Sequence, residues 1–370
     1  MKISLRRRQF VLGATAALTQ FGLIGPGSAQ TAAGKLAVPT VDSLTIRVLT
    51  DSSYDTPRPG SSKWVKVTRT PFISSKDFRK SLHNEWGLSL ALESRIGSDT
   101  RNLLLDFGYT PAALMNNMDI MGVDGSRMQG LIMSHGHYDH FGGLLGFLEK
   151  YRAQLPADLT LFVGGEDNFC LRKTQSATPG HFNDWGVLDR ADLERLKVKV
   201  VSCEKPTVVM GHAFSTGTIA RRSFEPMLPN TQVEYFKRNG VGCDLPAANA
   251  KAEGKPTADT HIHEHGTCFN VRDRGLVVIS SCGHAGIINT TLQAIEATGI
   301  QKVHAVMGGF HLFPAGEEHL RRTVAEMQKI GVDVVIPMHC SGPQLVVILR
   351  ELLADKLITS STGTIFQFGA

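Results

Sequence analysis

The chain has 370 residues, of which 42% are hydrophobic and 20% are charged. This composition is typical of a globular protein with a sizeable core and excludes a largely disordered chain. Four of the five net positive charges lie in the first 29 residues, which contain Lys2, Arg6, Arg7 and Arg8 and no acidic residue. The rest of the chain is nearly neutral, so a basic surface that binds nucleic acid is not expected.

Residues 1–29 have the features of an export signal. The segment around Arg6 and Arg7 resembles the twin-arginine pattern, and an apolar run at 11–24 and the small residues at 27–29 follow it. We therefore expect a cleaved signal peptide, recognition by the twin-arginine export machinery and a periplasmic mature protein. An uncleaved membrane anchor is the alternative, but the run is short and broken by glycines and Pro26.

The remaining chain has no segment that approaches eighteen uninterrupted apolar residues, so we expect no stable membrane association of the mature form. Six cysteines are scattered without a C-x-x-C pair. An even number in an exported chain permits disulfides, but their pairing cannot be read from sequence.

Residues 30–42 are predicted to be a flexible lead-in, and residues 43–370 a single domain. Patterning in its first part predicts strands at 43–50, 87–93, 101–107, 130–133 and 159–163, with helices at 110–117 and 141–151. The middle, 166–274, is predicted to be an irregular insertion with short strands at 198–202 and 233–236. Such a stretch is typical of the rim of a site, although a merely decorative insertion is the alternative.

From residue 275 strands and helices alternate regularly. Strands are expected at 276–281, 303–307 and 332–336, helices at 287–298, 317–330 and 344–353, and a last strand at 364–368 that closes a sheet edge. Strands come first and then alternate with helices, and this order occurs twice. We therefore predict an α/β fold of the four-layer αββα sandwich type, with two facing mixed sheets and helices outside.

Histidines gather where predicted strands end. The stretch SHGHYDHFGG, residues 134–143, directly follows one apolar strand, and His284, His311 and His339 each follow a later one at intervals of 27 and 28 residues. Loops at the carboxyl ends of strands carry the ligands and catalytic groups of α/β proteins. These side chains are therefore expected to meet at one edge of the sheets.

Imidazole and carboxylate suit zinc and similar first-row metals. His135 and His137 are two residues apart, so in extended chain they point the same way. Asp139 and His140 then lie on the turn into a helix, where they can serve a second metal. The sequence therefore predicts a metal site with one or two ions.

The motif His135-x-His137-x-Asp139-His140 resembles the signature of the metallo-β-lactamase superfamily. Further stretches are similar to its branch labelled 7,8-dihydropterin-6-methyl-4-(β-D-ribofuranosyl)-aminobenzene-5'-phosphate synthase: NEWGLSL at 84–90, LLDFG at 104–108, GTI at 217–219, SCGHAGIINT at 281–290, GGFHL at 308–312 and PMHCSG at 337–342. The resemblance implies that His135, His137 and His284 hold the first metal. It implies that Asp139, His140 and His339 hold the second.

One position departs from the superfamily pattern. Its members usually carry an aspartate that bridges the metals, and here His311 falls in that slot. His311 is therefore expected to be either a metal ligand or a proton donor. Diiron members that reduce oxygen replace the second motif histidine by glutamate, so the retained His137 favours zinc, with Mn²⁺ or Fe²⁺ as alternatives.

Several neighbouring residues have less certain roles. Asp106 and Asp51 follow strands, and the resemblance implies that they orient ligating imidazoles. The segment His261-Ile262-His263-Glu264-His265 lacks a preceding strand and is expected on the rim or surface. Cys282 and Cys340 are expected to pack beside the site as small buried groups.

The predicted activity is that of a metal-dependent hydrolase, in which bound metal lowers the pKa of water towards about 7. An ester, lactone, amide or phosphoester of a small molecule would be attacked, with Asp139 orienting the nucleophile and His311 in a catalytic role. Two alternatives remain: a pterin-phosphoribosyl synthase-like transferase, and an exported metal- or ligand-binding protein without turnover. The substrate and the oligomeric state cannot be predicted.

Overall fold

The structure is a computed structural model that describes residues 34–55, 62–227, 231–235, 237–244 and 255–369. The predicted signal peptide and the start of the lead-in lie outside these residues. Within them, no helix combines the length and the apolar character needed to cross a membrane.

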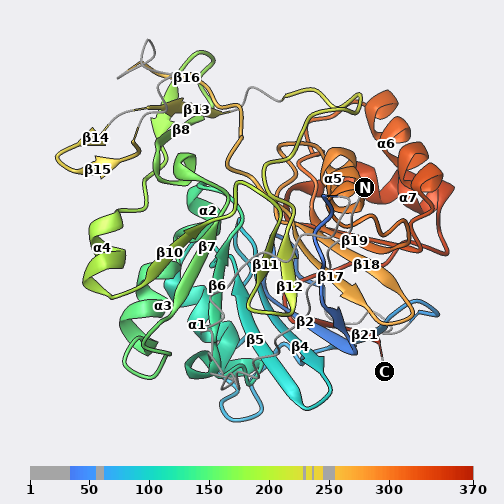
Figure 1. Ribbon diagram of the computed structural model, residues 1–370, viewed down its shortest axis with the longest axis horizontal. Coiled ribbons are helices and arrows are strands. Elements are labelled where there is room, and N and C mark those ends of the chain that lie inside the picture. The colour runs from blue at the N-terminus through green and yellow to red at the C-terminus, as the bar shows by residue number, and fades with distance from the viewer. Residues whose placement is uncertain (1–33, 56–61, 228–230, 236, 245–254, 370) are drawn as a thin grey trace, which may run out of the picture.

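Two β-sheets lie at the centre of the molecule (Figure 1). The first sheet has the strand order β10 (Lys199–Ser202), β7 (Thr160–Val163), β6 (Gly130–Met133), β5 (Asp99–Leu105), β4 (Ser89–Ile96), β2 (Ser43–Thr50), β21 (Thr364–Gly369) and β3 (Lys66–Arg69). The second has the order β11 (Thr207–Val209), β12 (Ala213–Ser215), β17 (Thr267–Val271), β18 (Gly275–Ser280), β19 (Val303–Gly309) and β20 (Val334–Met338), with β1 (Thr40–Val41) paired to β17.

Apolar side chains from both sheets fill the space between them. On β2, Leu44, Ile46 and Val48 alternate with partly exposed residues and join a cluster that includes Val277 and Met307 of the second sheet. Residues two apart share a face of a strand, so this alternation fixes which face of β2 points inward. The predicted pair of facing sheets is therefore confirmed.

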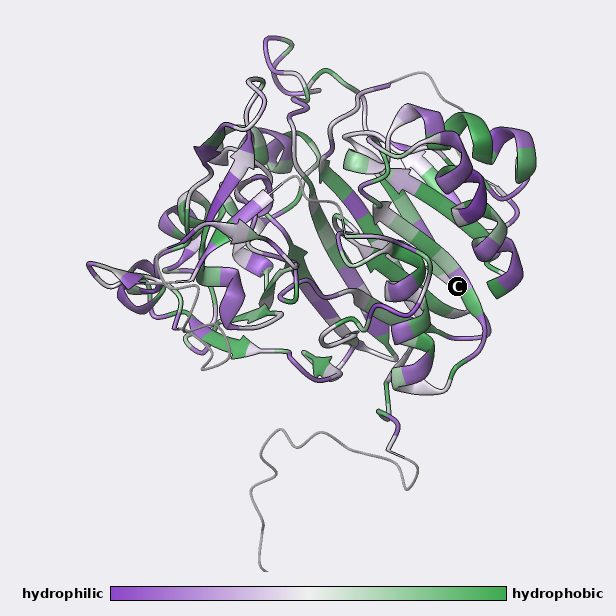
Figure 2. Cartoon of the chain, turned by 90° about the horizontal axis from the view of Figure 1, so that it is seen from above, coloured by the Kyte–Doolittle hydropathy of each residue, from purple (hydrophilic) through white to green (hydrophobic). Residues whose placement is uncertain are grey.

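Helices cover the outer face of each sheet. On the first sheet these are α1 (Pro111–Ile120), α3 (Leu144–Tyr151) and the short α4 (Arg190–Arg195), whose buried residues cluster with those of β5, β6 and β7. On the second sheet α5 (Ile287–Thr298), α6 (Glu317–Ile330) and α7 (Pro343–Leu352) cluster with β18, β19 and β20. Figure 2 shows hydrophobic strands between helices whose outer faces are hydrophilic. The four-layer αββα prediction is confirmed.

The segment 166–274 is more ordered than the sequence predicts. It supplies β10 to the first sheet and β11, β12 and β17 to the second. It also forms a small sheet of β16 (Thr257–Ala258), β13 (Thr231–Glu234), β8 (Leu171–Gln175) and β9 (Phe182–Asp184), the 3₁₀ helix η2 (Glu166–Phe169), and a ribbon of β14 (Lys237–Arg238) and β15 (Val241–Gly242). Strands of two to five residues show too little alternation to be recognised from sequence.

Several predicted elements agree with the structure at both ends, namely β2, β6, α5 and α6, and the others are shifted by a few residues. The last strand is an exception. β21 was expected at a sheet edge, but it lies between β2 and β3. The reason is that β3, a short and polar segment, adds beside it and takes the edge position.

Candidate metal centre

The strand ends meet as predicted. β18, β19 and β20 are parallel neighbours, so the loops that carry His284, His311 and His339 leave the second sheet at one edge. The His135–His140 motif follows β6 of the facing sheet and includes the one-turn helix α2 (Tyr138–Phe141). The site is therefore assembled from both layers of the sandwich.

The first predicted metal group is brought together by the fold. One ligand atom each of His135, His137 and His284 lie within 4.8 Å of one another, and all three side chains are buried. Their ring centroids are 4.5 Å apart between His135 and His137, 4.6 Å between His137 and His284, and 5.0 Å between His135 and His284. Three imidazoles in such a triangle can bind one metal ion.

The second predicted group is equally compact. Asp139, His140 and His339 have ligand atoms within 4.8 Å of one another and are buried. Asp139 Oδ2 lies 3.7 Å from His140 Nε2 and 3.4 Å from His339 Nε2. The rings of His135 and His140 are 4.2 Å apart, so the two groups adjoin.

Most of the ligand atoms that face this centre lack a hydrogen-bond partner among the described residues. These buried atoms are His135 Nε2, His137 Nε2, His140 Nε2, Asp139 Oδ1 and both ring nitrogens of His284. A buried polar atom without a partner costs roughly 1–3 kcal/mol. Six such atoms in one place fit a site that is completed by a cation.

Asp106 orients two of the imidazoles, as the resemblance implied. Its Oδ2 accepts a hydrogen bond from His140 Nδ1 at 2.8 Å and one from Ser134 Oγ at 2.7 Å. Ser134 Oγ in turn lies 2.9 Å from His135 Nδ1. A carboxylate can only accept, so His140 carries its proton on Nδ1 and keeps a lone pair on Nε2 for a metal.

Asp51 and Ser52 hold His339 in the same way. Asp51 Oδ1 accepts a hydrogen bond from the backbone N–H of His339 at 2.7 Å, and Ser52 Oγ lies 2.8 Å from His339 Nδ1. His339 has a φ of 48° and His311 a φ of 47°, in the left-handed region. Residues other than glycine adopt this region at a cost of about 1–3 kcal/mol, which the surrounding contacts must offset.

Burial sets the protonation of the first group. It lowers the pKa of His135 well below its usual range, and the neighbouring imidazoles lower this pKa further. The pKa of His284 is lowered well below its usual range for the same two reasons. Both rings are therefore neutral at neutral pH, which is the form that binds metals.

The second group has the opposite balance. Burial alone would lower the pKa of His140, but Asp139 and Asp106 outweigh it and raise that pKa. Burial would raise the pKa of Asp139, but His140 and His339 outweigh it and lower that pKa. The lowered pKa of Asp139 and the raised pKa of His140 have the same meaning: the surroundings of this group stabilise a positive charge.

His311 lies beside the metal groups, with its ring 4.2 Å from that of His284. Its Nδ1 is 3.4 Å from Cys282 Sγ, and its backbone N–H donates to Cys340 Sγ at 3.2 Å. Cys282 and Cys340 are both buried, as predicted, and their sulfur atoms are 3.2 Å apart.

The surface position predicted for the segment 261–265 is wrong. His261, His263, Glu264 and His265 are each at most 2% exposed. Glu264 accepts hydrogen bonds from the backbone N–H groups of 283, 284 and 285 at 2.7, 3.0 and 2.5 Å, and so fixes the loop of His284. The ring of His261 stacks on that of His284 at 4.1 Å. The high density of histidines in this segment could have indicated that it belongs to the site. Its burial could not be predicted, because the strands around it are too short to be recognised from sequence.

Asp259 and Arg172 brace this segment against the motif. Arg172 Nε donates to Asp259 Oδ2 at 2.7 Å and its Nη2 donates to His263 Nδ1 at 2.9 Å. Asp259 Oδ2 lies 3.6 Å from His137 Nε2, and Asp259, His137 and His261 form a further group of potential ligand atoms within 4.8 Å. Burial would raise the pKa of Asp259, but Arg172 and the neighbouring histidines together outweigh it and hold that pKa well below its usual range.

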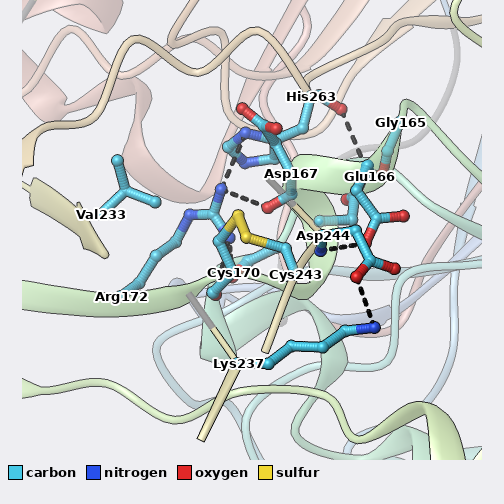
Figure 3. The surroundings of a disulfide bond; sticks show 12 residues. Gly165, Glu166, Asp167, Cys170, Arg172, Val233, Lys237, Cys243, Asp244 and His263 are labelled. Carbon is cyan, nitrogen blue, oxygen red and sulfur yellow. Dashed lines mark hydrogen bonds and ion pairs between the residues drawn. A yellow bond between two sulfur atoms is a disulfide. The ribbon is translucent and has the colours of Figure 1, made fainter. Parts of the chain in front are cut away.

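A disulfide lies behind Arg172 (Figure 3). It joins Cys170, next to β8, to Cys243, next to β15. The backbone carbonyls of Cys170 and Asp167 accept hydrogen bonds from Arg172 at 3.2 and 2.6 Å. The disulfide therefore anchors the part of the small sheet that positions Arg172 and, through it, Asp259.

Two cavities open beside the histidines. One, of about 250 Å³, is lined by His284 and His311 together with Glu225, Phe310 and His319. The other, of about 590 Å³, is lined by His339 and by residues of the loop after β2 and of α7. A larger hollow of about 680 Å³ beside α1 contains none of the histidines. Small molecules can thus approach the metal groups from two sides.

The family model for the metallo-beta-lactamase superfamily matches residues 94–158. The chain is 26% identical to a 7,8-dihydropterin-6-methyl-4-(beta-D-ribofuranosyl)-aminobenzene-5'-phosphate synthase of Methanocaldococcus jannaschii, over 77% of this chain and 90% of the relative. It is 24% identical to an uncharacterized protein of the same organism, over 69% of this chain and 84% of that protein.

The fold also matches a solved structure. Tm1679, described as a metal-dependent hydrolase of the beta-lactamase superfamily, superposes with a TM-score of 0.62 at 21% identity, covering 87% of this chain and 98% of that one. These matches confirm the resemblance that the motif at 135–140 predicts: the chain has the metallo-β-lactamase fold, and its residues 94–158 match the model of that superfamily.

Proposed function

We propose that the protein is a metal-dependent hydrolase that cleaves an ester, lactone, amide or phosphoester of a small molecule. The observation that carries this proposal is a set of buried ligand atoms that have no hydrogen-bond partner in the part of the chain that the structure describes. They belong to His135, His137, His140, Asp139 and His284. They come from loops of both sheets and converge on one place. The large majority of buried polar side-chain atoms in proteins are hydrogen-bonded, so a cluster of this size indicates a ligand.

The donor set fits the metals of this fold family. His135, His137 and His284 would hold one ion, and Asp139, His140 and His339 a second. Neutral imidazoles with one or few carboxylates favour Zn²⁺, and Mn²⁺ or Fe²⁺ are compatible with the same donors. A bound divalent ion supplies Lewis-acid polarisation of the scissile group and a lowered pKa for water.

The protein's own side chains complete the chemistry. Asp139 Oδ1 faces the centre without a partner and can accept a hydrogen bond from the attacking water, which orients that water. His311 lines the cavity of about 250 Å³ and is placed to donate a proton to the leaving group. The apolar wall formed by Phe310 and Leu312 excludes bulk water from one side of the substrate.

The test combines metal analysis with turnover. Purified protein is stripped of metal, reloaded with Zn²⁺, and assayed on a panel of phosphodiesters, lactones and β-lactams. We expect turnover that depends on metal and is lost in His137→Ala. The matched control is His304→Ala, because His304 is also buried but both of its ring nitrogens are bonded, to Asp333 and to the carbonyl of Trp64. Protein that binds no metal would refute the proposal.

A transferase is the second candidate, favoured by the match to a synthase over 90% of that relative. The same metal groups would then activate a donor for transfer to an acceptor other than water. Product analysis separates the two functions, since a hydrolase incorporates oxygen from ¹⁸O-labelled water into its product. A ligand-binding protein would show no turnover but a metal-dependent shift in melting temperature.

We further propose that the protein is exported by the twin-arginine route and acts in the periplasm. The pattern at Arg6 and Arg7 supports this, and so does the Cys170–Cys243 disulfide, since disulfides persist mainly in oxidising compartments. Fractionation of cells that express the wild type and an Arg6→Lys/Arg7→Lys variant tests it. Retention of the variant in the cytoplasm is expected.

A further inference from the structure

We propose that the Cys282 sulfur is a ligand of the metal centre, at the place where the two histidine groups adjoin. This inference deepens the proposed function and rests on it, because it takes the two histidine groups to hold metal. It assigns a role to a side chain that was expected only to fill space.

The position of the sulfur is the first argument. Cys282 follows β18 and is 3% exposed. Its Sγ, a ligand atom of His135 and one of His140 all lie within 4.8 Å of one another. His135 belongs to the first metal group and His140 to the second, so the sulfur adjoins both.

The open nitrogens give the second argument. His135 Nε2 and His140 Nε2 have no hydrogen-bond partner among the described residues, and their Nδ1 atoms are turned towards Ser134 and Asp106. With Zn–S near about 2.3 Å and Zn–N near about 2.0 Å, a sulfur and a nitrogen on one tetrahedral ion lie about 3.5 Å apart. The three ligand atoms lie within 4.8 Å of one another, so each pair has to close by at most about 1.3 Å to reach that spacing.

Charge gives the third argument. The six residues implied as ligands include one carboxylate, Asp139, and five imidazoles. Two buried divalent cations need more negative charge than one aspartate supplies. A cysteine that binds a metal does so as the thiolate, so ligation by Cys282 would add one negative charge at this place.

The hydrogen bonds distinguish Cys282 from Cys340. The Cys340 thiol donates to the carbonyl oxygen of Cys282 at 3.4 Å, and its sulfur accepts the backbone N–H of His311. Cys340 is thereby engaged in joining three strand-end loops. The Cys282 sulfur lies 3.4 Å from His311 Nδ1 and 3.2 Å from Cys340 Sγ, and unlike Cys340 it also shares a group of ligand atoms with His135 and His140. We therefore assign ligation to Cys282 and a supporting role to Cys340 and His311.

Cobalt provides a probe that does not depend on activity. Full-length protein is stripped of metal and titrated with Co²⁺, and the near-ultraviolet thiolate-to-cobalt charge-transfer band is recorded with the number of ions bound. The variants are Cys282→Ser, Cys282→Asp and Cys340→Ser, with Cys268→Ala as matched control. Cys268 is another buried cysteine, packed in the cluster on the outer face of the second sheet.

We expect the band in the wild type, Cys340→Ser and Cys268→Ala, and its loss in Cys282→Ser. Cys282→Asp, which supplies a carboxylate in place of the sulfur, should bind as many ions as the wild type without the band. This result would show that the loss is not caused by misfolding. A full band in Cys282→Ser, or its loss in Cys340→Ser, overturns the assignment. Wild type that binds Co²⁺ without the band overturns this inference alone, whereas wild type that binds no metal overturns the proposed function as well.

Discussion

Two histidine-rich segments, 135–140 and 259–265, lie side by side in the folded protein, and His265 of the second is bonded differently from the other rings. In the first, His135 and His140 each turn Nδ1 towards an oxygen, and their Nε2 atoms have no hydrogen-bond partner among the described residues. In the second, His261 and His263 likewise have one bonded ring nitrogen and one without a partner there. His265 lies within hydrogen-bond distance of Ser215 Oγ at 2.8 Å and of the carbonyl oxygen of Met133 at 3.1 Å, one at each ring nitrogen.

The comparison teaches that burial and histidine content do not by themselves define a ligand. What distinguishes His265 from the motif histidines is that both of its ring nitrogens are bonded, which leaves no lone pair for a metal. The second segment mainly braces the first: Arg172 bonds both Asp259 and His263, and Glu264 fixes the loop of His284. Each prediction below tests this division of roles.

The largest effect is expected from replacing one histidine in each segment. His137→Ala should lower metal affinity by more than about 100-fold, because even partners that only orient ligands are worth about 10–100-fold. His265→Gln should keep the metal and lose about 1–3 kcal/mol of stability from broken buried hydrogen bonds. Metal content by elemental analysis and urea unfolding check the pair. Loss of metal in both variants would contradict the assignment of His137, and not His265, as a ligand.

The next largest effect is expected from breaking the ion pair between Arg172 and Asp259. Arg172→Met leaves Asp259 buried without its partner, which should lower the free energy of unfolding by about 3–5 kcal/mol. The double variant Arg172→Met/Asp259→Asn removes the unpaired charge and should recover part of this loss. Urea unfolding of the wild type, both single variants and the double variant measures the coupling. Additive single effects would show that the pair is not a unit.

The disulfide beside Arg172 should contribute somewhat less to the free energy of unfolding than the ion pair does. Cys170 and Cys243 are 73 residues apart, and closing a loop of this length stabilises a protein by about 2–4 kcal/mol. Cys170→Ala/Cys243→Ala should lose this stability, and reducing agent should destabilise the wild type but leave the double variant unchanged. Equal midpoints of wild type and double variant in urea would contradict the anchoring role of the disulfide.

The smallest effect is expected from changing Asp106, which accepts the hydrogen bond from His140 Nδ1. Asp106→Asn keeps an acceptor for Ser134 but loses the carboxylate that fixes the proton of His140, so metal affinity should fall by about 10–100-fold. Asp119→Asn, an exposed change on α1, is the control and should have no effect. Competition with a metal chelator measures both. An unchanged affinity in Asp106→Asn would mean that the hydrogen bond from His140 Nδ1 is not what prepares the ligand.

Much of the metal centre could be predicted, because the relevant pattern is local. His135 to His140 lie within six residues, and His284, His311 and His339 each follow a strongly apolar strand that is easy to recognise. The four-layer fold followed from the same strands. The segment 166–274 could not be predicted, because its short strands and single turns carry no clear periodicity.

The sequence alone determined the α/β fold and the placement of histidines at strand ends, since these depend on period and spacing. The division of the ligands into two sets came from the resemblance to the superfamily. Only the tertiary structure decided that Asp259 to His265 are buried beside the motif, that Cys170 pairs with Cys243, and that Cys282 lies between the two groups. These contacts join residues far apart in the chain across two sheets. The register of those sheets, and not any local pattern, sets the distances between them.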